Sequence, residues 1–430
     1  MAQQGEPNNF EGNGLRGRVS WAVYDWANSS FAAIISTFVF PAYFARQVAE
    51  NETVGTSQWG YTVGIAGLIV ALSAPLLGAI ADQTGRRKPW IGGFTLLCVL
   101  ATAALWWVQP GADWILPAML LAGLATVGAE FAFVFYNAML PALSDGGRMG
   151  RWSGWAWGLG YAGGIIALLL ALFGLVHESA WLALPRDEAE HVRATFVLVA
   201  LWYGVFALPL FLFTPDVPGR RIRLRSAVTE GLGQLRDSLR QVRDYAHIVR
   251  FLIARMIFID GLATLFAFGG VYAAGTFGMN ETQVLMFGIA LNVTAGLGAA
   301  AFAWVDDWVG SKHTILVSLI GLIIPGTLLL WVESTTWFWI LGMVLGIFVG
   351  PVQAASRSYL GRTAPVHLRN QMFGLFAFSG KATAFLGPLL VGWVTAGFDS
   401  QRAGMSVIIV LLVIGFVLML SVPAARPERA

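Results

Sequence analysis

Two charged residues of opposite sign, Glu130 and Lys381, lie deep within long apolar stretches of the chain. A charge at the centre of a membrane-spanning helix costs at least about 2.5 kcal/mol, so it is expected to face a partner or a water-filled cavity. At 1.5 Å per residue, Glu130 lies roughly 15 Å and Lys381 roughly 18 Å from the nearer end of its stretch. Such a carboxylate suits a coupling proton, and such an ammonium suits the carboxylate of a substrate.

Further polar residues inside apolar stretches extend this candidate site. Glu130 and Asn137 share a helix face, as do Asp25 and Asn28, by the spacing of side chains on a helix. Asp260 lies about as deep as Glu130, and the shallower Arg255 is the expected partner of an acid such as Asp260. We predict Glu130 as the coupling residue and the following substrate-binding residues: Asp25, Trp26, Asn28, Tyr136, Asn137, Asp260, Arg357 and Lys381. The alternative is that these groups form buried structural ion pairs.

The composition indicates that these charged residues belong to a membrane protein. Hydrophobic residues make up 57% of the 430 residues and charged residues only 12%, whereas a soluble protein carries about 25% charged residues. Because backbone groups in lipid must pair within their own segment, we predict an all-α membrane protein. The net charge of +3 gives no reason to expect nucleic acid as a partner, and the single cysteine excludes an intramolecular disulfide.

A spanning helix needs roughly 20 mostly apolar residues, and twelve stretches satisfy this length. They are near 19–45, 59–81, 90–109, 114–140, 153–176, 194–213, 250–276, 283–305, 313–332, 336–360, 371–396 and 403–422. On this count 21 of the 27 basic residues fall on the side of the two termini, four fall on the opposite side and two fall within spans. The positive-inside rule then places both termini in the cytoplasm.

These spans divide the chain into two six-helix bundles, 19–213 and 250–422, flanked by cytoplasmic tails at 1–18 and 423–430. The segment 214–249 joins the bundles. Apolar residues recur every three or four positions in it, with arginines between them, which predicts an amphipathic helix. Such a helix suits the cytoplasmic membrane surface, or it packs beneath the bundle as a linker.

The two halves of the sequence echo each other. Asp82, Gly85 and Arg87 after the second span correspond to Asp307, Gly310 and Lys312 after the eighth, at one constant offset. Asp25 and Asp260 occupy similar places in the first and seventh spans. Two such repeats are typical of transporters in which two halves rock about a site at the membrane midplane.

The segment Gly78-x-x-x-Asp82-x-x-Gly85-Arg86-Arg87 resembles the signature loop of the major facilitator superfamily, with Gln83 where a basic residue is usual. This resemblance implies a twelve-helix fold that works by alternating access. It also implies a gate latch in which the Asp caps a helix N-terminus across the interface, so we assign the gate to Asp82, Gly85, Arg86, Arg87 and Asp307. We expect Asp307 to contribute less, because its loop matches the signature less well.

A narrower resemblance, to the vacuole-effluxer-like or "unknown major facilitator" family, covers most of the chain. The segments that carry it are Trp21-Ala-Val-Tyr24-Asp25-Trp26-Ala-Asn28-Ser29, Tyr136-Asn137-Ala-Met-Leu140-Pro141, Ser153-Gly154, Gly160-Tyr161, Asp260-Gly261, Gln353-Ala-Ala-Ser356-Arg357-Ser358, Phe373-Gly374, Gly380-Lys381 and Gly387-Pro388. Fungal autophagy-related members of that family release amino acids from the vacuole. This compact chain resembles the bacterial members, which implies the bacterial inner membrane.

The sequence thus predicts a secondary transporter of a small metabolite, with an amino acid as substrate, the proton as coupling ion, membrane lipids around it and a monomeric state. Two alternatives remain, a transporter of lipids or lipophilic compounds and a non-transporting membrane sensor. No cofactor, metal site or enzyme motif is predicted. Gly158-x-Gly160-x-x-Gly163 follows no strand, as a dinucleotide site would require, and it is better read as close helix packing.

Overall fold

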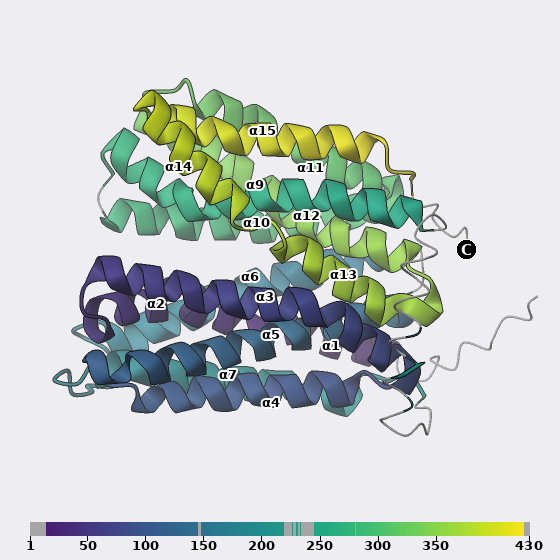
Figure 1. The fold of residues 1–430 in the computed structure, drawn as a ribbon, viewed down its shortest axis with the longest axis horizontal. Coiled ribbons are helices and arrows are strands. Elements are labelled where there is room, and N and C mark those ends of the chain that lie inside the picture. The colour runs from purple at the N-terminus through teal and green to yellow at the C-terminus, as the bar shows by residue number, and fades with distance from the viewer. Residues whose placement is uncertain are drawn as a thin grey trace, which may run out of the picture.

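The computed structural model describes residues 14–144, 148–218, 226, 229–230, 233, 245–279 and 281–424, and these residues form helices without any strand. Twelve of the helical stretches are long and apolar enough to cross a membrane, which confirms the predicted fold class. Figure 1 shows them as two layers, the N-terminal half in purple to teal and the C-terminal half in green to yellow.

The N-terminal half holds six spans around one hydrophobic core. The first span runs through α1 (Gly14–Ser30), wider turns at Phe31–Phe38, α2 (Val39–Tyr43) and Phe44–Val48. The other five are centred on α3 (Glu52–Thr84), α4 (Lys88–Ala104), α5 (Ile115–Leu143), α6 (Met149–Ala171) and α7 (Glu190–Phe213).

The C-terminal half packs around a second core. Its helices are α9 (Ala246–Phe277), α10 (Glu281–Val309), α11 (Ser311–Leu329), α12 (Thr335–Thr363), α13 (Arg369–Lys381), α14 (Leu386–Phe398) and α15 (Gln401–Leu420). Most of the segment predicted as an amphipathic linker helix, 214–249, lies outside the described residues.

The eleventh span is not the continuous helix that the sequence predicts. Turns at 382–385 separate α13 from α14. Pro388 explains the break, because its nitrogen cannot bond to the carbonyl of Ala384 and its ring collides with that carbonyl in a continuous helix. Pro388 is instead the third residue of α14, where a missing N–H costs little.

The halves meet most closely along two helix pairs, α3 with α13 and α6 with α10. Small residues allow this approach. A methyl group on Gly78 of α3 would lie 2.5 Å from the carbonyl oxygen of Asn370, and one on Gly154 of α6 would lie 2.5 Å from that of Ala299. We call the end of the molecule that carries Gly14 and Asp82 the motif end, and the other the opposite end.

Candidate functional site

Glu130 and Lys381 form an ion pair between the two halves. The Lys381 Nζ lies 2.8 Å from Glu130 Oε1, and the two side chains are 34% and 30% exposed, respectively. Glu130 lies in the middle of α5, and Lys381 is the last residue of α13, directly before the break in span eleven. The pair can therefore be reached by a solute, and it would have to separate for the two halves to part there.

Three aromatic side chains of the N-terminal half contact one another, and one of them, Phe133, lies near Glu130 on α5. Phe133, one turn beyond Glu130 on α5, meets the Trp157 ring edge-on at 6.5 Å between centroids, and Trp157 lies 6.0 Å from Tyr161. The indole nitrogen of Trp157 is buried and has no hydrogen-bond partner. The Tyr161 hydroxyl accepts a hydrogen bond of 3.4 Å from Gln353 of the other half. We call Phe133, Trp157 and Tyr161 the aromatic wall.

Arg357 of α12 lies inside the N-terminal half and not at the exposed pair. It donates to Asp25 Oδ2 and to Asn137 Oδ1, each at 3.1 Å, and to the hydroxyl and carbonyl oxygens of Ser153. Tyr136 donates to the same oxygen of Asp25 at 2.9 Å. Arg357 is 1% exposed and Asp25 is 4% exposed.

This network places four of the predicted substrate-binding residues away from the exposed pair. Arg357, Asp25, Tyr136 and Asn137 satisfy one another in a sealed contact between the halves, so they are not open to a substrate in this conformation. Trp26 is also directed elsewhere, because it stacks on Trp202 of α7 at 5.4 Å. Asn28 of the same helix keeps a buried side-chain oxygen without a partner.

The expected pairing of Arg255 with Asp260 is wrong. Arg255 donates to the carbonyl oxygen of Phe376 at 2.8 Å and to the hydroxyl of Ser379 at 2.7 Å, both on α13. Asp260 is 3% exposed, and its Oδ1 atom has no hydrogen-bond partner. Asp260 thus lies within the C-terminal half and does not line the space around Glu130.

At the motif end, Asp82 caps the start of α13 in the other half. Its Oδ1 accepts from the backbone and side-chain nitrogens of Asn370 at 3.1 and 2.7 Å, and its Oδ2 accepts from the backbone of Gln371 at 2.9 Å. An anion at a helix N-terminus is stabilised by the unpaired N–H groups and the helix dipole. This contact holds the two halves together at that end.

The other motif residues support this contact unequally. Gly85 has a φ of 78°, a backbone conformation that suits glycine, and it ends α3. Arg87 is buried and donates to the side chain of Asn370 at 3.0 Å. Burial lowers the pKa of Arg87, and the carboxylates of Asp82 and Asp216 oppose that shift. Arg86 is exposed and takes no part in the cap.

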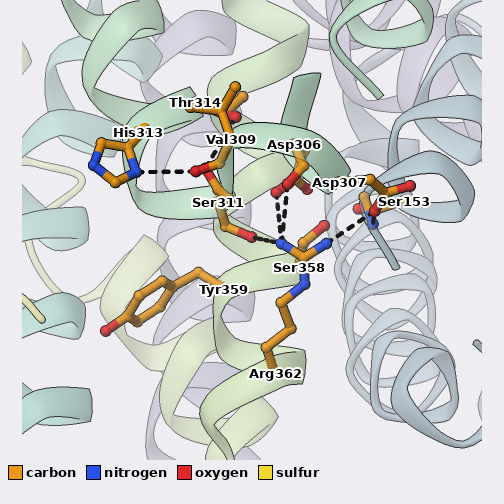
Figure 2. Close-up of polar contacts among 12 residues, drawn as sticks. Ser153, Asp306, Asp307, Val309, Ser311, His313, Thr314, Ser358, Tyr359 and Arg362 are labelled. Atoms are coloured by element: carbon orange, nitrogen blue, oxygen red, sulfur yellow. Dashed lines mark hydrogen bonds and ion pairs between the residues drawn. The ribbon is translucent and has the colours of Figure 1, made fainter. Parts of the chain in front are cut away.

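Asp307 forms the corresponding cap on α6. Its Oδ1 accepts from the backbone of Gly150 at 2.7 Å, and its Oδ2 accepts from the backbone and side chain of Arg151 at 3.2 and 2.9 Å. Arg362 lies between Asp306 and Asp307 and bonds to both carboxylates at 2.9 Å (Figure 2). We expected Asp307 to contribute less than Asp82 to the gate, but its contacts are at least as numerous.

Sequence reasoning missed several residues at this end. Arg362 could have been noticed as a basic residue near the end of span ten, but nothing in its spacing shows that it pairs with two aspartates 55 and 56 residues away. Asp216 accepts from the backbone N–H groups of Arg87 and Lys88, both at 3.0 Å, and so caps α4. Ser153 lies in one of the segments that carry the family resemblance, and nothing in its spacing shows that it binds Arg357.

Known proteins resemble this chain over nearly its whole length. The family model described as vacuole effluxer Atg22 like matches residues 47–430. An uncharacterised MFS-type transporter of Bacillus subtilis, YxiO, is 28% identical over 410 residues, covering 94% of both chains. Autophagy-related protein 22 of Coccidioides immitis is 22% identical over 491 residues, covering 95% of this chain and 79% of the relative.

Solved structures show the same fold. The proton:xylose symporter XylE, bound to a brominated deoxyglucose, superposes with a TM-score of 0.74 at 14% identity and covers 97% of this chain and 98% of its own. FucP in the outward conformation superposes with a TM-score of 0.75 at 12% identity, covering 95% and 99%. The chain therefore belongs to the vacuole effluxer Atg22-like family and is a multi-pass membrane transporter of the major facilitator superfamily.

Proposed function

We propose that this transporter moves an amino acid by proton-coupled alternating access. The observation that carries the proposal is the part-exposed ion pair of Glu130 and Lys381, which joins the two halves near the middle of their spans. A free amino acid carries the same two charges. Its ammonium can replace Lys381 at Glu130, and its carboxylate can replace Glu130 at Lys381, so that binding exchanges one set of charge pairs for another.

The basic residues support an orientation in which the motif end faces the cytoplasm. The caps made by Asp82 and Asp307 are both formed at that end, so this conformation would be closed toward the cytoplasm and open outward. Resemblance to YxiO of Bacillus subtilis supports a place in a bacterial plasma membrane. We propose that a single chain performs the cycle, because each half supplies one charge of the pair.

Glu130 is the proposed proton carrier. In this conformation the Lys381 ammonium lies 2.8 Å from the Glu130 carboxylate and pairs with it. We propose that Glu130 takes up the coupled proton when neither Lys381 nor the ammonium of a substrate is paired with it.

The aromatic wall of Phe133, Trp157 and Tyr161 favours a second candidate, a lipophilic solute. The two candidates differ in what they require of the ion pair, because a neutral lipophile needs neither charge. A lipophile transporter would therefore keep its activity when both charges are removed together.

Purified protein can be tested in liposomes with an imposed proton gradient, using a mixture of radiolabelled amino acids, a labelled hexose and a fluorescent lipid as separate probes. We expect accumulation of at least one amino acid, and loss of that accumulation in Lys381→Met. Glu178→Gln, which removes an exposed acid in a loop at the opposite end, is the matched control and should behave as wild type. Movement of the lipid alone, unaffected by Lys381→Met, would replace this proposal with the second candidate.

A further inference from the structure

A groove opens on the surface of the N-terminal half at the motif end. It lies between the start of α4 and the end of α7, two helices that pack against each other, and its volume is about 510 Å³. Figure 1 shows α4 on the side of that half that is turned away from the C-terminal half. The residues that line the groove come from these two helices and the segments directly beside them, so the groove does not lie between the halves.

The groove crosses the level at which the two spans end. The span of α4 begins at Lys88, and the span of α7 ends at Phe213. Arg86 and Asp216 line the groove beyond these ends, whereas Gly92 lines it inside the span of α4. A groove that is charged outside the apolar layer and apolar within it suits an amphiphilic molecule that lies in the membrane.

The acidic residue of the groove is already satisfied by the protein. The Asp216 Oδ1 atom accepts from the backbone N–H groups of Arg87 and Val217 at 3.0 and 2.9 Å, and its Oδ2 atom accepts from that of Lys88 at 3.0 Å. These contacts place the carboxylate at the start of α4, where the helix dipole stabilises an anion. Asp216 thus serves the fold of the groove.

The two basic residues of the groove keep hydrogen-bond donors for a ligand. The Lys88 ammonium donates to the carbonyl oxygen of Phe211 at 2.9 Å, which uses one of its three N–H groups. Arg86 is exposed, and its side chain makes no hydrogen bond to the part of the chain that the structure describes. Two cations therefore line the groove beside one acid, and this excess of positive charge favours an anionic ligand.

A contact like that of Lys88 occurs in the C-terminal half without a second cation. Lys312, near the start of α11, donates to the carbonyl oxygen of Leu420 at the end of α15, also at 2.9 Å. Neither of the two residues before Lys312 is basic, whereas Arg86 stands two residues before Lys88. Joining the two helices therefore does not require Arg86.

Gly92 keeps the groove open. It lies four residues after Lys88, and a methyl group on it would already lie 3.4 Å from the Phe211 ring, so a larger side chain would fill this space. Four residues after Lys312, the C-terminal half carries Leu316, which packs against its core. Because the equivalent helix pair accommodates leucine, packing alone does not explain the glycine.

The surface continues the groove as an apolar track along both helices. A methyl group on Gly93 would meet nothing within 4 Å. Leu96 and Leu100, one and two turns beyond Gly92 on α4, are 57% and 59% exposed, and Leu208 of α7 is 53% exposed. An acyl chain whose head group sits in the groove would lie against these side chains.

We propose that the groove binds an anionic phospholipid of the leaflet at the motif end. Its phosphodiester group pairs with Arg86 and Lys88, and one acyl chain passes Gly92 and lies along Leu96. Basic residues at a membrane surface attract anionic lipids, and the charge excess in the groove disfavours a zwitterionic head group by comparison. The site depends neither on the transported substrate nor on the position of the two halves.

Native mass spectrometry of the purified protein tests the charged part of the site, with phosphatidylglycerol and phosphatidylcholine as separate probes. We expect the first phosphatidylglycerol to bind more tightly than phosphatidylcholine. Arg86→Gln and Lys88→Gln should each weaken it about fivefold, and Arg148→Gln, at an exposed basic position of the same end, should not. Equal binding of the two lipids, or an equal loss in Arg148→Gln, would overturn the proposal. If Lys88→Gln does not fold, Arg86→Gln decides alone, because its side chain supports no other contact.

The apolar part of the site has its own test. Gly92→Leu fills the groove and should weaken phosphatidylglycerol binding, whereas Gly397→Leu, at an exposed position of α14 with open surroundings, should leave it unchanged. Undiminished binding in Gly92→Leu would reject this groove as the lipid site. An excess of inorganic phosphate separates a lipid from a free anion. Displacement of the lipid by phosphate, in the wild type and in Gly92→Leu alike, would identify a phosphate site and overturn the lipid proposal.

Discussion

Asp82 and Asp307 hold equivalent positions at the motif end, each capping the first turn of a helix in the opposite half. Asp82 accepts from Gln371 of α13 at 2.9 Å, and Asp307 accepts from Gly150 of α6 at 2.7 Å. The internal repeat of the sequence therefore corresponds to a repeated contact. Both contacts must break before this end can open.

Asp82→Asn should shift the population toward the state that is open at the motif end. The substitution keeps the shape but removes an anion from a helix N-terminus, a loss of about 1 kcal/mol and hence a several-fold change in population. A single cysteine placed in the space between the two halves reports this shift. Its reaction with a thiol reagent is measured from each side of reconstituted vesicles. Unchanged accessibility from both sides would count against the latch.

Asp307→Asn should shift the same equilibrium at least as far as Asp82→Asn. Asp307 meets two backbone N–H groups and two arginines, Arg151 and Arg362, whereas Asp82 meets no arginine directly. Measured under identical conditions, a smaller effect for Asp307→Asn would show that the arginines contribute little. Arg362→Met should reproduce part of the effect, because it removes one of these partners.

The number and positions of the spans could be predicted because backbone groups in lipid must form hydrogen bonds within their own helix. Apolar length and the placement of arginines together identify all twelve. The interruption at 382–385 was missed although Pro388 was visible, since many spanning helices tolerate a proline. Whether a helix kinks or breaks depends on the neighbours that satisfy the freed backbone groups, and such neighbours are distant in sequence.

The sequence predicts which residues belong to the candidate site better than it predicts which of them contact one another. Depth alone selected Glu130 and Lys381, and the structure brings them together. The distance from the end of a span also identified Arg357, Asp25 and Asp260. This distance does not tell which way a side chain points around the helix axis or which half supplies its partner. Arg357 therefore seemed suited to a substrate carboxylate, whereas it binds Asp25 of the other half at 3.1 Å.

The orientation of the chain can be tested by labelling single cysteines in intact cells. Substitutions at the exposed loop residues Glu178 and Glu333 should react with an impermeant reagent, and substitutions at the exposed His313 and His367 should react only after lysis. These positions lie at opposite ends of the spans, and the asymmetry of the basic residues places the histidines inside. A reversed or mixed pattern would contradict cytoplasmic termini.

Asp25 and Arg357 should behave as a structural pair between the halves. Arg357→Met or Asp25→Asn alone leaves one buried charge without its partner and should destabilise the protein by about 3–5 kcal/mol. The double variant should recover much of the lost thermal stability, because no charge is then stranded. If the double variant is no more stable than the single variants, the loss of stability does not come from an unpaired buried charge.

Glu130→Gln should separate proton coupling from binding. The amide keeps the size of the side chain and its hydrogen bonding, but it cannot release a proton. We expect uptake driven by a proton gradient to cease, whereas counterflow exchange of the same amino acid should survive, because exchange needs no net proton movement. Both are measured in liposomes containing a labelled amino acid that the wild-type protein accumulates.

The companion variant, Lys381→Met, should weaken binding of the substrate carboxylate and so reduce exchange as well as uptake. If Glu130→Gln merely unfolds the protein and the double variant Glu130→Gln with Lys381→Met restores its stability, the pair is structural, because removing both charges strands neither. Full gradient-driven uptake by Glu130→Gln would instead transfer the coupling role to another buried acid. Asp260 would then be examined first, since its Oδ1 atom is free of hydrogen bonds while Asp25 is already paired with Arg357.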